Sequence, residues 1–208
     1  MQTGYCQNRD FGIWYGFNAE HSISKKIEID LAAVLRTFNN ATRTDQAFLE
    51  GGITYKLNKH LSASGSYRFT EKIESNSRFY PRHKLFADIK ATLPSGSFIF
   101  SSRFRFQYQN KTFIEKVSDE IPDYHFRIKL KAVYKIPQFP LNPYLYFESF
   151  SQLFANAHRF SDKNRFAAGV ECKITQKQSV DAGYMLQRDF EPHISDMYIV
   201  SINYNFKF

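Results

Sequence analysis

The sequence predicts an all-β protein, a transmembrane antiparallel up-and-down β-barrel of ten to twelve strands. Apolar and polar residues alternate in blocks of about ten residues from Phe11 to the C-terminus, which is typical of barrel strands. Short and long connections alternate between the blocks, and aromatic residues gather on one face of the blocks while charges gather on the other. We expect one domain over residues 1–208, with residues 1–10 as a loose N-terminal segment.

Eleven blocks show the alternation, and none has apolar residues at helical spacing over a useful length. The predicted strands are Phe11–His21, Lys26–Phe38, Phe48–Leu57, Leu61–Thr70, Arg82–Leu93, Phe98–Gln109, His125–Lys135, Tyr144–Gln152, Arg165–Ile174, Val180–Gln187 and Met197–Phe208.

The connections alternate in length along the chain. The short turns are expected at Ser22–Lys25, Asn58–His60, Pro94–Ser97, Pro137–Pro143 and Thr175–Ser179, and the longer polar loops at Thr37–Ala47, Glu71–Pro81, Asn110–Tyr124 and Leu153–Asn164. Outer-membrane barrels have short periplasmic turns and longer extracellular loops, so the same assignment is expected here.

The composition excludes two other classes. Aromatic residues make up 17% of the chain and charged residues 23%, at a mean hydropathy of −0.46. No run of about 18 apolar residues occurs, as a transmembrane helix would need, and the apolar content is too high for a disordered chain. Cys6 and Cys172 stand alone, so no metal site or cofactor is predicted.

Alternation alone does not indicate which face of a strand points inward, so we assign the faces from their composition. In the sixth block Phe98, Phe100, Phe104 and Phe106 share one face, and Arg103 and Arg105 lie on the other. Large aromatic side chains on nearly every strand would overfill the inside of a small soluble barrel, whereas lipid has room for them. The aromatic face is therefore predicted to meet lipid.

The net charge of +8 raises the alternative of a nucleic-acid partner. RNA-binding sheets carry aromatic and basic residues interleaved on one face. Here the two kinds occupy opposite faces of the same strands, and no nucleic-acid partner is expected.

An odd number of blocks conflicts with the even strand number of bacterial single-chain barrels. Either Gln2–Asn8 forms a further strand, giving twelve, or the block around Trp14 does not belong fully to the wall, giving ten. We favour twelve.

The end of the chain resembles the C-terminal signal that the bacterial barrel-assembly machinery recognises. Its alternating residues are Tyr198, Val200, Ile202, Tyr204, Phe206 and the terminal Phe208. The resemblance implies an outer-membrane protein whose precursor signal peptide has been removed, with the assembly machinery, lipid and lipopolysaccharide, and other outer-membrane proteins as partners.

A looser resemblance covers nearly the whole chain. It rests on Trp14 in the first strand, a Ser24-Lys25-Lys26 turn, a strand ending at Arg36, Tyr67-Arg68-Phe69 and Arg165-Phe-Ala-Ala-Gly169. These features resemble a family of Bacteroidota outer-membrane barrels known as domain of unknown function 2490. The resemblance implies fold and location, and it brings no catalytic or ligand residues.

If the aromatic face meets lipid, the other face lines a lumen with unevenly distributed charge. The basic residues come from the middle blocks: Arg68, Arg82, Lys84, Lys90, Arg103, Arg105, Arg127, Lys129 and Lys131. The acidic residues come from the flanking blocks: Glu28, Asp30, Glu50, Glu148, Glu171 and Asp181. A narrow lumen would be plugged by ion pairs, and a wider one would favour anions near the basic wall.

Three functions are compatible with this lumen. A narrow channel or binding barrel for anionic solutes, similar in architecture and charge to twelve-stranded channels for acidic oligosaccharides, is the first hypothesis. A non-conducting accessory barrel of a larger outer-membrane complex is the alternative. A lipid- or peptide-modifying enzyme is a third hypothesis. Such an enzyme needs a nucleophile beside a base, and the most tempting pairs are His158 with Ser161, and His83 with Ser75 or Ser77. No spacing marks such a pair, and no catalytic residue is assigned among the six histidines, which are His21, His60, His83, His125, His158 and His193.

Overall fold

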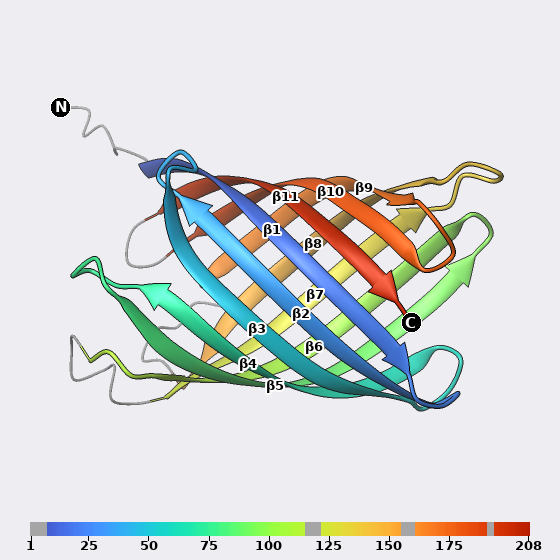
Figure 1. The fold of residues 1–208 in the computed structure, drawn as a ribbon, viewed down its shortest axis with the longest axis horizontal. Coiled ribbons are helices and arrows are strands. Elements are labelled where there is room, and N and C mark those ends of the chain that lie inside the picture. Colours follow the sequence, from blue (N-terminus) through green and yellow to red (C-terminus); the bar gives the residue numbers. More distant parts are fainter. Residues whose placement is uncertain (1–7, 115–121, 155–160, 191–193) are drawn as a thin grey trace.

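The computed structural model shows a closed β-barrel and describes residues 8–114, 122–154, 161–190 and 194–208 (Figure 1). Within these residues eleven strands form the wall: β1 (Asn8–Ser22), β2 (Ile27–Phe38), β3 (Arg43–Lys56), β4 (Leu61–Ile73), β5 (Phe79–Ser95), β6 (Phe98–Lys111), β7 (Asp123–Tyr134), β8 (Leu141–Leu153), β9 (Lys163–Lys173), β10 (Gln178–Asp189) and β11 (Ser195–Lys207). The predicted all-β up-and-down barrel is confirmed.

The barrel closes through a parallel seam between β1 and β11, paired from Asn8 with Ser195 to Glu20 with Lys207. All other neighbours are antiparallel. The described residues therefore form eleven strands, and the preference for twelve is not met. With an odd number the first and last strands run in the same direction, so only a parallel pair can close the wall.

Neither proposed way to reach an even number describes the structure. The block around Trp14 is a complete wall strand, hydrogen-bonded to β2 on one side and to β11 on the other. Of the segment Gln2–Asn8, only Asn8 lies among the described residues, as the first residue of β1. β1 therefore begins at the end of the barrel opposite to the C-terminus (Figure 1).

The two ends of the barrel differ, and we name them by their connections. The short-turn end carries the turns after β1, β3, β5, β7 and β9, and the loop end carries the connections after the even-numbered strands. Two expected loops are shorter than predicted: β2 ends at Phe38 as expected but β3 already begins at Arg43, and β4 and β5 leave only residues 74–78 between them. The connection between β2 and β3 is a tight turn instead of a loop over Thr37–Ala47. A register shift at Arg36/Thr37 and hydrogen bonds from the Asn39 and Asn40 amides to Asp10 hold this turn tight.

Burial is inverted relative to a soluble barrel. Many large apolar side chains of the wall are exposed on its outer face, such as Leu49 and Leu145, each 64% exposed. The charged Glu148, at 3%, and Arg105 and Arg127 are buried inside. Water would penalise this arrangement, whereas lipid around the wall stabilises it.

Candidate functional site: a plugged lumen with a one-sided vestibule

A ring of alternating cationic and aromatic side chains crosses the middle of the lumen. In strand order from β1 to β9 it contains Trp14, Arg36, Phe48, Arg68, Phe86, Arg105, Arg127, Phe150 and Arg165. The guanidinium carbons lie 3.8 to 5.0 Å from the ring centroids they face. Each such contact stabilises the cation where water is scarce.

The ring is nearly continuous because three of its arginines, Arg36, Arg68 and Arg165, each face two aromatic rings. Arg36 lies 3.8 Å from the Trp14 ring and 5.0 Å from the Phe48 ring. Arg165 faces Phe150 at 4.6 Å and returns to Trp14 at 5.0 Å. Between Arg105 and Arg127 the aromatic residue is missing, and a hydrogen bond from Arg127 to Gln107, 3.2 Å, takes its place.

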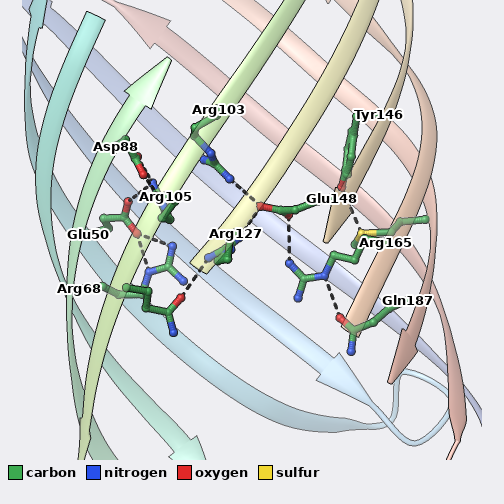
Figure 2. Close-up of polar contacts among 12 residues, drawn as sticks. Glu50, Arg68, Asp88, Arg103, Arg105, Arg127, Tyr146, Glu148, Arg165 and Gln187 are labelled. Atoms are coloured by element: carbon green, nitrogen blue, oxygen red, sulfur yellow. Dashed lines mark hydrogen bonds and ion pairs between the residues drawn. The ribbon is translucent and has the colours of Figure 1, made fainter. Parts of the chain in front are cut away.

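Three carboxylates neutralise part of this charge (Figure 2). Asp88 accepts two hydrogen bonds of 2.6 Å from Arg105, and Glu50 accepts one of 2.5 Å from Arg68. A planar guanidinium suits such paired acceptors. We call the nine ring residues together with Glu50, Asp88 and Glu148 the plug.

Glu148 is the most connected acid of the plug (Figure 2). Its Oε1 accepts hydrogen bonds of 2.7 Å from both Arg103 and Arg127, and its Oε2 lies 3.6 Å from Arg165. Glu148 thus connects β6, β7 and β9 to β8. A carboxylate that is 3% exposed needs such partners, because an uncompensated buried charge is costly.

The last two strands complete the middle layer with apolar side chains. Met185 of β10 and Ile199 of β11 are 2% and 0% exposed and lie opposite each other in register. Tyr146 donates a hydrogen bond to the Met185 sulfur, 3.1 Å. All eleven strands of the wall therefore contribute a side chain to this middle layer.

A vestibule of about 1480 Å³ lies between the plug and the short-turn end. Its inner part contains Arg103, Arg105, Asp88 and Glu50, and hydroxyl and amide side chains such as those of Thr54, Ser62, Ser64, Ser66, Asn203 and Asn205 line its wall. Lys56, Lys59, Lys173, Lys177 and Lys207 surround its mouth. The cavity is lined largely by polar side chains, and its described lining lies on the short-turn side of the plug.

Tyr144 covers part of the vestibule wall beside the plug. Its hydroxyl donates a hydrogen bond of 2.9 Å to Asp181 and lies across two glycines of the neighbouring strands. A Cβ at Gly169 or Gly183 would come within 2.4 or 2.7 Å of the Tyr144 oxygen. The two glycines therefore provide the space that this aromatic side chain occupies.

The structure distributes the predicted lumen residues over three zones. Arg68, Arg103, Arg105, Arg127, Glu50 and Glu148 lie in or against the plug. Lys131, Glu171, Asp181, Glu28 and Asp30 line the vestibule, where Lys131 faces the Tyr144 ring at 4.1 Å and Asp30 accepts a hydrogen bond from Thr54. Three other predicted residues lie outside these two zones. Arg82 pairs with Glu74 at the loop end, Lys84 is the register neighbour of Arg68, and Lys129 faces the Tyr146 ring at 3.7 Å.

The ion pairs of the plug join neighbouring strands more than opposite walls. Glu50 with Arg68 and Asp88 with Arg105 are direct register partners. Adjacent strands lie about 4.8 Å apart, which suits a carboxylate and a guanidinium on the same face. A contrast between one basic and one acidic wall therefore does not describe the middle layer.

Sequence reasoning missed several residues of the plug. Asp88, Arg36 and Arg165 were not among the predicted charges, and Trp14, Phe48, Phe86 and Phe150 lie on the lumen face although aromatics were assigned to lipid. One signal was present: an aromatic residue stands two positions from each plug carboxylate, in Phe48-x-Glu50, Phe86-x-Asp88 and Glu148-x-Phe150.

The loop end is held by further ion pairs: Lys72 with Asp45 at 3.2 Å, Lys111 with Asp123 at 3.1 Å and Lys163 with Asp189 at 2.8 Å. Of the histidines, His158 and His193 lie outside the described residues. His83 is bonded to the Tyr67 hydroxyl at 2.7 Å, and Ser77 accepts a hydrogen bond from Arg43 at 3.4 Å. No nucleophile and base come together among the described hydrogen bonds of His83, Ser77 and Ser161.

The described ranges contain no helix with the length and hydropathy needed to cross a membrane. Within the same ranges, no group of three or more His, Cys, Asp or Glu residues is arranged to hold a metal ion.

The apolar outer face and the charged lumen define the class of protein: a membrane-embedded β-barrel with ion pairs and cation–aromatic contacts in the middle of its lumen. The family described as "Protein of unknown function (DUF2490)" matches residues 11–198, and the chain belongs to this family.

Two solved structures are similar in fold. The beta domain of the Bordetella autotransporter BrkA has a TM-score of 0.58 at 9% identity, covering 90% of this chain and 86% of that one. The NanC porin has a TM-score of 0.55 at 12% identity, covering 95% and 99%. No curated protein matches the sequence at a significant level.

Proposed function

We propose that this protein is an outer-membrane barrel that binds an anionic solute in a blind vestibule and does not conduct in its resting form. The observation that carries the proposal is the plug, a filled layer that separates a vestibule of about 1480 Å³ from the loop end. A binding barrel needs a cavity with one entrance, whereas a channel needs a continuous path.

The chemistry of the vestibule supports an acidic, hydroxyl-rich solute. Lysines surround the mouth, where Lys56 and Lys207 pair with Glu28 and Glu20 while Lys59, Lys173 and Lys177 have no ion pair among the described residues, and Lys90 and Lys131 lie further inside. Serine, threonine and asparagine side chains on the wall offer hydrogen bonds to hydroxyl groups. An acidic oligosaccharide combines the two kinds of group.

The placement in the outer membrane rests on the exposed apolar face and on the C-terminal strand. In that strand Tyr198, Val200, Ile202, Tyr204, Phe206 and Phe208 alternate with lumen-facing residues, and Ile199 on the other face is fully buried. Such a strand suits recognition by the barrel-assembly machinery. In this placement the short-turn end, with the vestibule mouth, faces the periplasm.

Planar-bilayer recording tests the closed state. Purified wild-type barrel is expected to show no conductance steps, and the double variant Arg127→Ala/Glu148→Ala, which removes one charge of each sign from the plug, is expected to show them. Anion-selective steps from the wild type would contradict the plug and support an open channel instead.

Calorimetric titration with oligogalacturonate tests the ligand. The wild type is expected to bind it, and Lys90→Gln/Lys131→Gln to bind it more weakly by about tenfold or more, since each lysine contributes about 1 kcal/mol to an anion at close range. A neutral oligosaccharide of equal length is the control. A barrel that is silent in bilayers and binds neither sugar would support the alternative, a non-conducting accessory protein of a larger outer-membrane complex.

A further inference from the structure

The lipid-facing surface is not uniformly convex. A groove of about 1150 Å³ lies on the outer face across β5 to β10. Large exposed apolar side chains border it, among them Phe100, Leu130, Leu145, Phe166 and Tyr184. Its surface is almost entirely apolar, so its occupant has to be apolar too.

Small outward-facing residues create the groove. Ala91, Ser102, Ala132 and Ala168 stand on β5, β6, β7 and β9 between larger neighbours. Leu145 on β8 pairs in register with Ala132 on one side and with Ala168 on the other, so a large side chain stands between two small ones. This alternation of large and small side chains forms the groove, whose depth is about that of a large side chain.

Basic residues stand where the groove reaches the short-turn end. His60 lines the groove at this end, held by a contact of 3.0 Å between its Nδ1 and the Thr92 carbonyl, and Lys59 precedes it. Lys135 follows β7 three residues after Ala132, about 10 Å along the strand direction. Lys59 and Lys135 are exposed.

Nothing acidic competes with these cations in the turns. The connections 23–26, 57–60, 96–97, 135–140 and 174–177 contain no Asp or Glu, and they carry Lys25, Lys26, Lys59, Lys135 and Lys177. All of these turns lie within the described residues. The turns at this end of the barrel therefore offer an anion basic side chains and no carboxylate.

We propose that this groove is a binding site for an anionic phospholipid. The acyl chains occupy the apolar groove, and the phosphate lies at its short-turn end between Lys59 and Lys135. An apolar groove that ends at lysines matches an amphiphile with an anionic head. Lysine at this depth reaches the headgroup while its apolar stem stays along the wall.

Native mass spectrometry tests the proposal by measuring how much lipid stays bound to the detergent-purified barrel. The barrel is titrated with phosphatidylglycerol or with phosphatidylcholine of the same acyl chains. The wild type is expected to retain phosphatidylglycerol in preference to phosphatidylcholine. Ala132→Leu/Ala168→Leu fills the groove and is expected to weaken both lipids. Both substitutions place an apolar side chain toward lipid, so the barrel is expected to fold.

The charge is tested separately. Lys135→Gln is expected to weaken phosphatidylglycerol about fivefold, and Lys59→Gln/Lys135→Gln about 30-fold, with little change for phosphatidylcholine. Lys135 does not line the vestibule, so its variant leaves oligogalacturonate binding unchanged and separates this proposal from the proposed function.

Matched controls lie across the barrel. Lys25→Gln/Lys26→Gln removes two turn lysines away from the groove, and Ala47→Leu enlarges an exposed alanine of β3. Both are expected to bind like the wild type. Three outcomes would overturn the proposal. The wild type could bind the two lipids equally, Ala132→Leu/Ala168→Leu could bind them like the wild type, or Lys25→Gln/Lys26→Gln could lose as much phosphatidylglycerol binding as Lys59→Gln/Lys135→Gln.

Discussion

The plug and the short-turn end carry positive charge in opposite ways. The plug uses arginine throughout: Arg36, Arg68, Arg105, Arg127 and Arg165, with Arg103 beside them. The short-turn end uses lysine throughout: Lys25, Lys26, Lys56, Lys59, Lys135, Lys173, Lys177 and Lys207. The two sets have the same charge per residue and different surroundings.

The difference follows from the shape and hydration of the two cations. A guanidinium is planar and weakly hydrated, so it can stack on an aromatic ring and bind a carboxylate with two parallel hydrogen bonds, as Arg105 does between Phe86 and Asp88. An ammonium group is strongly hydrated and stays near water. The arginines are therefore held in the middle of the lumen. Exposed lysines without an ion pair among the described residues, such as Lys59 and Lys135, remain available to a ligand or a lipid, whereas Lys56 and Lys207 pair with Glu28 and Glu20.

The strongest way to break the plug is to remove its central acid. Glu148→Gln leaves Arg103, Arg127 and Arg165 without their shared carboxylate, and we expect a loss of about 3–5 kcal/mol in the free energy of unfolding. Urea unfolding in detergent micelles measures it. Glu171→Gln, a vestibule acid without a described ion pair, is the control and should change stability far less.

A smaller effect is expected when an arginine of the plug becomes lysine. Arg105→Lys keeps the charge but loses one of the two hydrogen bonds to Asp88 and the stacking on Phe86, for a loss of about 2 kcal/mol. The same unfolding assay applies, with Lys131→Arg in the vestibule as the reverse exchange. If Arg105→Lys and Lys131→Arg lowered the free energy of unfolding equally, the plug would not depend on arginine more than the vestibule does.

The single tryptophan reports on the plug directly. Trp14 lies between Arg36 and Arg165, so Arg165→Ala should open one face of the indole to water. We expect acrylamide to quench the fluorescence of this variant more strongly than that of the wild type. Lys173→Ala, at the vestibule mouth, should leave the quenching constant unchanged.

The smallest effect is expected at the turn lysines. Lys25→Gln/Lys26→Gln should change the free energy of unfolding by less than about 0.5 kcal/mol, because both residues are exposed and have no ion pair among the described residues. A loss above about 1 kcal/mol would show that these lysines are structural.

Much of the fold could be read from residue alternation, because a period of two identifies a strand and its two faces without reference to distant partners. All eleven predicted blocks correspond to strands, although several boundaries at the loop end were set too short, as at the start of β3 and the end of β4. The aromatic content of one face, in β6 above all, correctly indicated which face is exposed on the outside of the barrel.

The candidate site was less predictable. Arg68 and Arg105 could be assigned to the lumen face. The spacing of Phe48, Phe86 and Phe150 two positions from a carboxylate places them on the same face, but it does not say that they stack against the arginines. The contacts in the middle of the lumen require these side chains to lie at the same height of the barrel. Register and strand tilt set that height.

By itself the sequence determined the strands, the exposed apolar face and the charges of the interior, since these follow from local alternation and composition. Only the tertiary structure decided the parallel β1–β11 seam, the layer in which Trp14 meets Arg36 and Arg165, and the one-sided vestibule. The physical reason is that closure and register bring residues more than a hundred positions apart to the same height of the barrel, and no local pattern records that height.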